Sequence, residues 1–272
     1  MTRICLCGAT GRMGSTVAKH LLLDEELEIV SAIAANDPNE GKDLGLFLGQ
    51  RELGIKISDV KDLNSILDSS KPDLLVDFTQ TEAAIKTAKI ASEKKINLVI
   101  GTTGFNSQQL EELNKIIEDN KISAVIAPNM SVGVNIFFKV IKTLTEHLKD
   151  YDIEILELHH NKKRDAPSGT AKKAAEIIAT SLGRDLNKSG VYGREGIIGE
   201  RTKEEIGVHA IRAGDIVGEH TVYYAGFGER IEFTHKAHSR DCLAAGTVKA
   251  VKFLANNQNK SKVFGMADVL GL

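Results

Sequence analysis

The chain has 272 residues, of which 42% are hydrophobic and 26% charged, so it is long enough for about two domains with buried cores. Its formal net charge of -2 gives no general attraction to nucleic acids or to anionic membranes. Since no apolar run reaches the roughly 20 residues that span a bilayer, we expect a globular protein without a nucleic-acid or membrane partner.

The cysteines and the first residues of the chain indicate the cellular compartment. Cys5, Cys7 and Cys242 are odd in number and lack the spacing of metal ligands. Cys5 and Cys7 alternate along a predicted strand, so we expect both to pack on one face as small hydrophobic residues. The chain enters that strand at once, without the layout of a signal peptide. A reduced, cytoplasmic compartment fits these features best.

A glycine-rich turn follows the first predicted strand, which covers residues 3–9. Gly8, Gly11 and Gly14 have a GxxGxxG spacing, and a helical pattern and a second strand at 27–35 come next. Strand, glycine turn, helix and strand in this order are the context of a dinucleotide-binding motif. The spacing is looser than the usual GxGxxG, and glycine also serves ordinary turns. The flanking elements favour binding of NADH or NADPH here.

The end of the second strand does not choose between the two nucleotides. An acidic residue there would bind the ribose 2′-hydroxyl of NADH, whereas a nearby arginine would bind the 2′-phosphate of NADPH. The strand ends with Asn36 and Asp37, which places the acidic residue one or two positions late. The nearest cation is Lys42. NADH, NADPH or both therefore stay open as cofactors.

Strands and helices then alternate along the chain. The predicted strands cover residues 72–79, 97–103 and 123–129, and the helices cover 81–94 and 107–118. Continuous apolar strands separated by amphipathic helices indicate a parallel sheet that is covered on both faces. Ligands bind beyond the carboxyl ends of such strands, where this chain carries runs of small or hydroxylated residues. Each run could equally be an ordinary turn between strand and helix.

The pattern changes in the second half of the chain. The predicted elements are a helix at 131–149, a strand at 152–159, a helix at 171–182, a loop-like region at 183–203, strands at 206–212, 216–225 and 230–238, and a helix at 240–255. The short turns between the last three strands favour antiparallel neighbours. With the earlier strand they would form a mixed, largely antiparallel four-stranded sheet. Its open face could be buried against another subunit.

Residues 154–170 carry the densest group of reactive side chains. His159, His160 and Lys163 follow the strand closely, and Ser168 stands at the start of the next helix. Imidazoles and cations at a strand end would lie near the N–H groups of a helix start, which favour an anion. Such an arrangement would hold a small carboxylate next to a proton donor. A solvated basic loop is the competing interpretation.

The individual residues differ in what they could do. His159 and His160 face opposite ways on a strand, so we expect at most one to face the reacting centre. Lys163 is expected to anchor a carboxylate, and Arg240 could reach the same ligand. Adjacent histidines without a ligand at i+3 or i+4 are a poor metal motif, so no metal is expected. Packing or interface roles are assigned to His209, His220, His235 and His238.

Six motifs occur together and in the order of a known family. They are Gly8-Ala-Thr-Gly-Arg-Met-Gly14, Gly101-Thr-Thr-Gly104, Asn129-Met-Ser-Val-Gly-Val-Asn135, Glu157-Leu-His-His-Asn-Lys-Lys-Arg-Asp-Ala-Pro-Ser-Gly-Thr-Ala171, Arg212-Ala-Gly-Asp-Ile-Val-Gly-Glu-His220 and Glu232-Phe-Thr-His-Lys-Ala-His-Ser-Arg240. Together they resemble the 4-hydroxy-tetrahydrodipicolinate reductase (dihydrodipicolinate reductase) family across essentially the whole chain. The fourth motif is far more specific than the glycine turn.

The resemblance implies an NAD(P)H oxidoreductase of lysine and diaminopimelate synthesis. Such an enzyme reduces (2S,4S)-4-hydroxy-2,3,4,5-tetrahydrodipicolinate to (S)-2,3,4,5-tetrahydrodipicolinate with loss of water. The resemblance also implies a Rossmann-like α/β domain at 1–130 and 240–272 that binds the dinucleotide. Residues 131–239 would form an α+β domain for substrate binding and oligomerisation in a homotetramer.

The resemblance also implies roles for single residues. His159 would donate or accept the proton that completes reduction after hydride transfer, and Lys163 would donate a proton or hold a carboxylate. The residues expected to bind substrate are His160, Ser168, Gly169, Thr170 and Arg240. Those expected to line the cofactor are Gly8, Ala9, Thr10, Gly11, Arg12, Met13, Gly101, Thr102, Thr103, Ala127, Pro128, Asn129 and Met130. Some members carry an acidic residue followed by arginine after the second strand, and this chain departs from them there.

Two other functions compete with this one. A two-domain oxidoreductase of the semialdehyde or homoserine dehydrogenase type would share the fold logic but not the His-His-Lys element. A regulator that binds NADH without chemistry would need a basic surface for DNA, such as a helix-turn-helix. The sequence, with its charge of -2, contains no such element.

Overall fold

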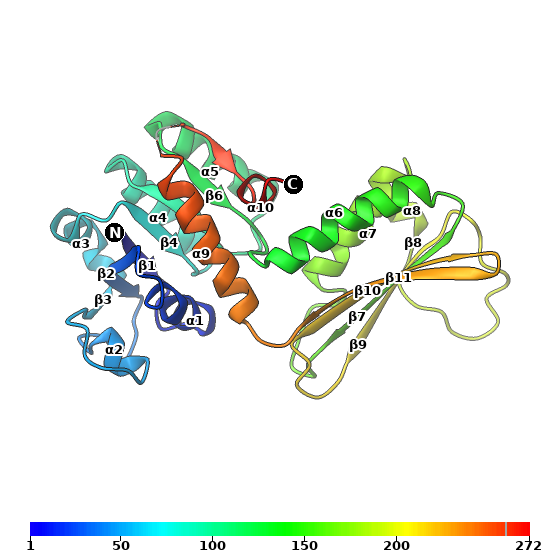
Figure 1. The fold of residues 1–272 in the computed structure, drawn as a ribbon, viewed down its shortest axis with the longest axis horizontal. Helices are drawn as coiled ribbons and strands as arrows, with labels where there is room; N and C mark the ends of the chain where they lie inside the picture. Colours follow the sequence, from blue (N-terminus) through cyan, green and yellow to red (C-terminus); the bar gives the residue numbers. More distant parts are fainter. Residues whose placement is uncertain (259) are drawn as a thin grey trace. The chain divides into compact units, whose positions relative to one another are not determined.

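The computed structural model describes residues 1–258 and 260–272 (Figure 1). The chain forms two compact units: unit 1 comprises Met1–Val132 and Asp241–Leu272, and unit 2 comprises Gly133–Arg240. Unit 1 is therefore built from two segments that the whole of unit 2 separates in the sequence. Among the described residues, no helix is both long enough and apolar enough to cross a membrane.

Unit 1 contains a seven-stranded sheet. Its strands are β1 (Thr2–Cys7), β2 (Leu27–Ala34), β3 (Ile57–Asp59), β4 (Leu74–Asp77), β5 (Asn97–Ile100), β6 (Ala124–Ile126) and β12 (Val263–Phe264). They lie in the order β12-β6-β5-β4-β1-β2-β3, and every neighbouring pair is parallel. The strand order reverses at β1, and the region beyond the carboxyl ends at such a reversal is where Rossmann-type sheets bind ligands.

Helices cover both faces of this sheet (Figure 1). One face packs against α1 (Arg12–Leu21), α9 (Asp241–Ala255) and α10 (Met266–Leu270), and the other against α3 (Leu63–Ser70), α4 (Thr81–Glu93) and α5 (Ser107–Asn120). Alternate residues of β1 serve the two cores: Ile4 and Leu6 face the first, whereas Cys5 and Cys7 face the second. Both cysteines are fully buried, as expected for small hydrophobic residues. The short helices α2 (Leu44–Phe47) and η1 (Val60–Asp62) lie in the connections around β3.

Unit 2 contains a mixed sheet of five strands rather than the four predicted. Its elements are α6 (Val132–His147), β7 (Asp152–His159), α7 (Gly169–Ser181), α8 (Leu186–Ser189), β8 (Gly190–Val191), β9 (Ile206–Arg212), β10 (Gly218–Gly226) and β11 (Glu229–Ala237). The spatial order is β11-β10-β7-β9-β8. The extra strand, β8, lies in the region predicted as a loop, and two residues are too few to show an alternating pattern. Helices α6 and α7 share one apolar core with the sheet.

The predicted pairing of β9 with β10 is wrong. β7 lies between them, parallel to β9 and antiparallel to β10, while β10 and β11 are antiparallel neighbours as predicted. The turn after β9 crosses the end of β7, where the Ala213 N–H donates to the His159 carbonyl at 2.9 Å. The Asn161 N–H donates to the Gly214 carbonyl at 3.1 Å. A short turn can thus connect strands that are not neighbours, and β7 becomes the central strand.

The face of β7 that packs against the helices changes from apolar to polar along the strand. Ile155 is fully buried in the apolar core, and Glu157 and His159 follow on the same face. His220 of β10 lies opposite Glu157, and Arg212 of β9 lies beside His159. The apolar core of unit 2 therefore ends in a polar cluster at the carboxyl end of β7.

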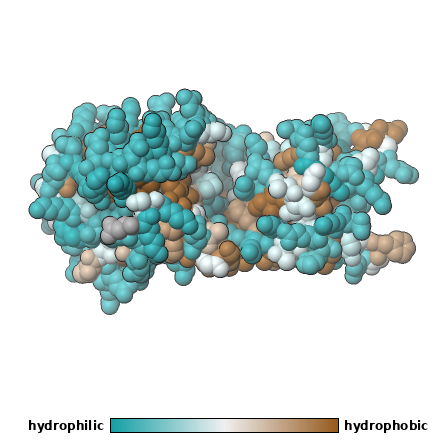
Figure 2. Space-filling model, turned by 90° about the horizontal axis from the view of Figure 1, so that it is seen from above, coloured by the Kyte–Doolittle hydropathy of each residue, from teal (hydrophilic) through white to brown (hydrophobic). Residues whose placement is uncertain are grey.

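Hydrophilic residues cover most of the molecular face shown in Figure 2, with apolar residues in smaller patches. The large apolar residues exposed in unit 2 include Tyr192, Ile197, Ile198 and Phe227. Three of these lie between α8 and β9, in the long segment whose Arg194 and Arg201 contact Glu154 of β7. Exposed apolar groups of this kind are candidates for contact with another protein surface.

Candidate active site

The turn between β1 and α1 lets the backbone approach its neighbours closely. Gly8 has a φ of +79°, and a Cβ at this position would lie 2.6 Å from the Phe78 carbonyl oxygen. A Cβ on Gly14 would lie 1.9 Å from the Gly8 carbonyl oxygen, so only glycine allows α1 to pack this tightly. α1 begins after Gly11, and no side chain among the described residues caps its first N–H groups. These N–H groups suit an anion such as a pyrophosphate.

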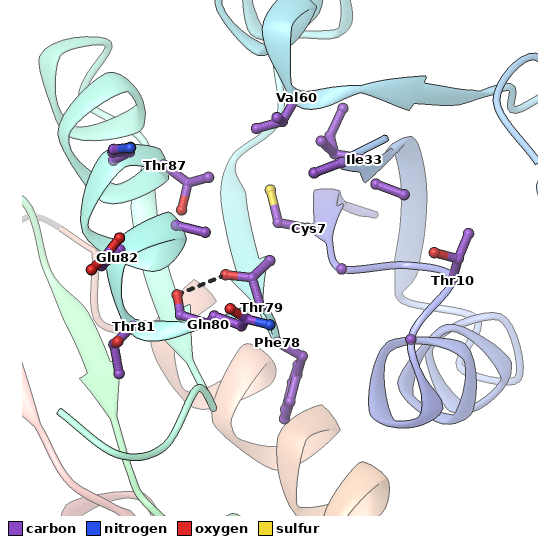
Figure 3. A pocket seen from close by; sticks show the side chains of 16 residues that line it. Cys7, Thr10, Ile33, Val60, Phe78, Thr79, Gln80, Thr81, Glu82 and Thr87 are labelled. Atoms are coloured by element: carbon purple, nitrogen blue, oxygen red, sulfur yellow. Dashed lines mark hydrogen bonds between the residues drawn. The ribbon is translucent and has the colours of Figure 1, made fainter. Parts of the chain in front are cut away.

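A cavity of about 820 Å³ opens beyond this turn (Figure 3). Of the residues predicted to bind the cofactor, Gly8, Thr10 and Gly11 line it. Its other walls come from the ends of β2 and β4, from η1 and from the start of α4. They include Ala34, Ala35, Val60, Phe78, Thr79, Gln80 and Thr81, which the prediction omits. A concave site with many small and apolar residues suits a flat nucleoside.

The other predicted cofactor residues lie at neighbouring strand ends. The glycine turn and the start of α1 contain Ala9, Arg12 and Met13. The segment after β5 contains Gly101, Thr102 and Thr103, and the segment after β6 contains Ala127, Pro128, Asn129 and Met130. Since β6, β5, β4 and β1 are adjacent and parallel, these segments lie along one edge of the sheet. Four of them, Ala9, Thr102, Ala127 and Met130, are buried. Buried positions of this kind can offer backbone groups, but not side chains, to a ligand.

A buried carboxylate, Asp77, joins several of these segments. It ends β4, and its Oδ1 accepts hydrogen bonds from the Thr79 N–H at 3.0 Å and the Thr102 hydroxyl at 2.7 Å. Its Oδ2 accepts one from the Thr87 hydroxyl of α4 at 2.7 Å. Asp77 therefore fixes the turns after β4 and β5 relative to α4. The sequence shows Asp77 at a strand end, but it does not show that the carboxylate points inward.

In unit 2 the ring of His159 is held by a buried carboxylate on the same face of β7. Its Nδ1 lies 2.5 Å from Oε2 of Glu157. Arg212 donates to both Glu157 oxygens, at 2.9 Å and 2.7 Å, and the Ser168 N–H donates to Oε1 at 3.0 Å. Burial by itself would raise the pKa of Glu157, but the hydrogen bonds from His159, Arg212 and Ser168 outweigh it and lower the pKa to about 2. Glu157 is therefore ionised at neutral pH.

Helix α7 starts beside this cluster. The Ser168 hydroxyl caps the helix by accepting a hydrogen bond from the Ala171 N–H at 3.2 Å. Gly169 faces open space, because a Cβ at this position would meet none of the described atoms within 4 Å. Thr170 follows in the first turn of the helix. The predicted carboxylate site at Ser168 to Thr170 is thus connected to His159 through Glu157.

The remaining predicted residues lie at the same end of the sheet. The Lys163 ammonium forms an ion pair with Oδ1 of Asp165 at 2.9 Å. His160 follows β7 directly, and its Nδ1 is buried without a hydrogen-bond partner among the described residues. Arg240 is exposed, three residues after the end of β11. The structure thus gathers His159, His160, Lys163 and the helix start, and it shows Lys163 already paired.

Two histidines that the sequence assigns to packing or interfaces belong to this cluster. The His220 ring lies 5.2 Å from the His159 ring between centroids, and its Nε2 lies 3.0 Å from the Ser168 hydroxyl. Burial, followed by the charge of His159, lowers the pKa of His220 to about 3, so it is neutral at pH 7. His235 lies 6.5 Å from His220, and burial lowers its pKa as well. Neighbours across a sheet leave no local signal in the sequence.

Comparison with known proteins identifies the family. Residues 2–130 match the family described as dihydrodipicolinate reductase, N-terminus, and residues 133–270 match dihydrodipicolinate reductase, C-terminus. The chain belongs to the dihydrodipicolinate reductase family. The two matched regions adjoin where unit 1 gives way to unit 2 along the chain.

Full-length relatives of the chain are named 4-hydroxy-tetrahydrodipicolinate reductase. The protein of Methanobrevibacter smithii is 50% identical over 273 residues, which cover 100% of both chains. That of Methanocaldococcus jannaschii is 47% identical and covers 100% of this chain and 98% of the relative. Identity at this level over the full length identifies the chain as an enzyme of this kind.

Solved structures support the α/β fold of the chain. A dipicolinate-bound dihydrodipicolinate reductase from Paenisporosarcina sp. TG-14 has a TM-score of 0.77 at 23% identity, with 98% of each chain covered. An amine dehydrogenase from Mycobacterium smegmatis has a TM-score of 0.59 at 16% identity, with 93% of this chain and 92% of that one covered. The fold is therefore shared with another dehydrogenase, and it is the family match that separates them.

Proposed function

We propose that this enzyme reduces 4-hydroxy-tetrahydrodipicolinate to tetrahydrodipicolinate with loss of water and with a hydride from NADH or NADPH. The observation that carries the proposal is the cluster of Glu157, His159 and Ser168, in a family whose members bear the name of this reaction. The reduced nicotinamide, when bound, supplies the hydride. The protein must supply a proton and hold two substrate carboxylates.

The cluster in unit 2 offers groups for both tasks. His159 is the proposed proton donor, since histidine is the side chain that most often transfers protons in enzymes and its Nδ1 already has a partner in Glu157. The N–H groups at the start of α7, near Gly169 and Thr170, are proposed to bind one carboxylate. Lys163 is proposed to bind a carboxylate or to share the proton transfer, after its ammonium leaves Asp165.

Unit 1 is the proposed binding unit for the dinucleotide. The uncapped start of α1 and the glycine turn suit a pyrophosphate, and the adjoining cavity has room for a nucleoside. The turns after β5 and β6 are proposed to contact the nicotinamide half through their backbone groups. His160 and Arg240 keep their proposed roles as substrate contacts.

We also propose that NADH is preferred over NADPH. Oδ2 of Asp37 accepts a hydrogen bond from the Thr10 hydroxyl at 2.5 Å, so its carboxylate lies beside the glycine turn. Hydrogen bonds from Thr10 and Asn39 lower the pKa of Asp37, which is ionised at neutral pH. Lys42 lies over the Phe47 ring, with its ammonium 5.9 Å from the ring centroid. An ionised carboxylate suits a ribose 2′-hydroxyl and repels a 2′-phosphate.

A homotetramer in the cytoplasm remains the proposed state of the enzyme. Exposed apolar residues in unit 2, such as Ile197, Ile198 and Ile211, support an interface there. Light scattering on the purified protein should give about four times the 29.5 kDa mass of one chain. A mass of one chain that persists at micromolar concentration would contradict the tetramer.

A coupled assay tests the reaction and the nucleotide together. A synthase generates the substrate in place from pyruvate and aspartate semialdehyde, and absorbance at 340 nm follows NADH or NADPH in separate runs. We expect oxidation of the nucleotide that depends on the synthase, with the higher kcat/KM for NADH. Absence of oxidation with either nucleotide would sink the proposed function, whereas a higher value for NADPH would overturn only the preference.

A further inference from the structure

Glu157 is an unusual residue for the interior of a small sheet. It is fully buried, yet its two oxygens take part in four polar contacts. Arg212 contacts both oxygens, the Ser168 N–H binds Oε1, and His159 Nδ1 meets Oε2 at 2.5 Å. Buried charges are retained only where such contacts offset their desolvation. The carboxylate is therefore fixed in position from three sides.

Arg212 makes this position rigid. It ends β9, and the parallel register of β9 with β7 places it beside His159. Its planar guanidinium meets the Glu157 carboxylate with two parallel hydrogen bonds. It also donates to the carbonyl of Asp165, in the loop before α7, at 2.8 Å. One side chain thus connects the carboxylate, the strand pair and the loop that carries Lys163.

The geometry distinguishes the two nitrogens of His159. An ionised carboxylate only accepts hydrogen bonds, so Nδ1 must carry a proton. No residue among those described forms a hydrogen bond with Nε2. On that side lies Gly218, where a Cβ would come within 3.0 Å of Nε2. The nitrogen left for a ligand is therefore Nε2, and glycine keeps the approach to it open.

We propose that Glu157, held by Arg212, is a positioning residue that fixes the tautomer and orientation of His159 so that Nε2 transfers the proton. This inference rests on the proposed function of His159 and adds to it the pair that makes the imidazole competent. The logic is that of a carboxylate that orients a general acid–base histidine.

The other groups around His159 are consistent with this role. His220 of β10 has its pKa lowered to about 3, chiefly by burial, so it adds no second positive charge at neutral pH. His235 of β11 lies behind it, and burial lowers its pKa too. The charge of Lys163 in the following loop is offset by Asp165. Glu157 is therefore the anion that His159 contacts directly.

A purely structural ion pair is the rival explanation, because Glu157 and Arg212 also tie β7, β9 and α7 together. The two explanations differ in what a Glu157→Gln variant changes. An amide of the same shape keeps much of the packing but can donate to Nδ1, which favours the opposite tautomer. A structural role predicts lower thermal stability alone. A positioning role predicts a change in the state of the His159 ring and in its kinetics.

The test uses the full chain with ¹⁵N-labelled histidine. Solid-state ¹⁵N spectra report the tautomer of each ring, and a His159→Gln sample identifies the His159 signals. We expect wild-type His159 in its neutral form to carry the proton on Nδ1, and Glu157→Gln to lose this state. In the coupled assay Glu157→Gln should lower kcat about 10²-fold or more, and the pH profile of kcat should change, because the ring no longer faces a carboxylate.

Two further variants keep the test decisive. Glu154→Gln, on the opposite face of β7, should leave kcat and the His159 signals unchanged. Arg212→Lys keeps the charge but loses the paired donors, so it should lower kcat less than Glu157→Gln does. If Glu157→Gln fails to fold, the kinetics of Arg212→Lys still test the positioning role.

The outcomes separate this inference from the proposed function. Wild-type kcat, pH profile and tautomer in Glu157→Gln would overturn the positioning role, as would a loss of thermal stability without those changes. Should the wild-type protein lack reductase activity, the proposed function fails. The ring spectra would then still show whether Glu157 sets the tautomer.

Discussion

Two glutamates of β7 build similar networks on opposite faces of unit 2. Glu154 contacts Arg194, Arg201 and His209, whereas Glu157 contacts Arg212, His159 and the Ser168 N–H. In both cases burial would raise the pKa of the carboxyl, and the hydrogen bonds outweigh it and lower the pKa to about 2. Carboxylate, guanidinium and imidazole thus meet twice on one short strand.

The two networks differ in what lies around them. The Glu154 side chain is 26% exposed and binds two arginines of the long segment before β9, which it tethers to the sheet. His209 meets the Glu154 carboxylate with Nε2, at 2.7 Å. His159 meets its own carboxylate with Nδ1, so the outer nitrogen of the ring is left for a ligand. The two networks contain the same types of residue. They differ in which ring nitrogen meets the carboxylate, and this decides which nitrogen a ligand can reach.

Exchange of the two histidines for glutamine should separate the networks most strongly. His159→Gln should lower kcat by roughly 10²–10⁴-fold, the usual loss for a general acid–base group, with little change in nucleotide affinity. His209→Gln should keep kcat within about twofold, because its ring serves the tether. Steady-state kinetics in the coupled assay measure both. Equal losses in the two variants would remove the distinction between the networks.

A smaller difference is expected between two neighbouring lysines. Lys163→Ala should lower kcat/KM by about 10- to 100-fold, because a hydrogen bond to a charged group contributes about 1.5–3 kcal/mol. Lys162 is exposed, and Lys162→Ala should behave like the wild-type enzyme. Substrate saturation curves distinguish a rise in KM from a fall in kcat. Matching kinetics in the two variants would place Lys163 outside the site.

The smallest effect concerns stability in acid. The folded-state pKa of both glutamates is lowered from 4.5 to about 2, so each contributes stability above pH 4.5 that is lost as the pH falls toward 2. Burial chiefly lowers the pKa of His220 from 6.5 to about 3, so folding excludes a proton there and stability already declines below pH 6.5. Glu154→Gln should remove only its own share of the lower window, about 2 kcal/mol or less.

Urea unfolding at a series of pH values checks this prediction. The wild-type curve should decline in two overlapping windows, and Glu154→Gln should flatten the lower one while leaving the upper one intact. A variant with the same pH dependence as the wild type would show that Glu154 is not held as an ionised carboxylate. Activity at neutral pH serves as the control for folding.

Local patterns in the sequence are sufficient to predict much of the fold. Continuous apolar strands and amphipathic helices predict the parallel sheet of unit 1, and the family match supports the α/β class. The alternating residues before His159 predict β7, and Ser168 predicts the start of α7. Both signals arise within a few neighbouring residues. The strands β3, β8 and β12 were missed because two or three residues show no period.

The supporting groups of the candidate site could not be predicted in the same way. Glu157 and Arg212 are 55 positions apart, and they meet only because β9 runs parallel to β7. The short turn after β9 suggests a hairpin, and that wrong pairing conceals the contact. His220 likewise reaches His159 through cross-strand pairing. Non-local pairing is set by the packing of the whole sheet, which one sequence does not display.

Because unit 1 consists of two separate segments of the chain, its two parts are synthesised at different times. Helix α9 covers α1, β4, β5 and β6 with residues such as Ala244, Val251 and Leu254, and a Cβ on Gly246 would lie 1.7 Å from the Met130 carbonyl oxygen. On the ribosome these residues emerge only after all of unit 2 has been made. The nascent first segment must therefore wait with part of one apolar face uncovered. Unit 2, whose residues are contiguous, can complete its own core first.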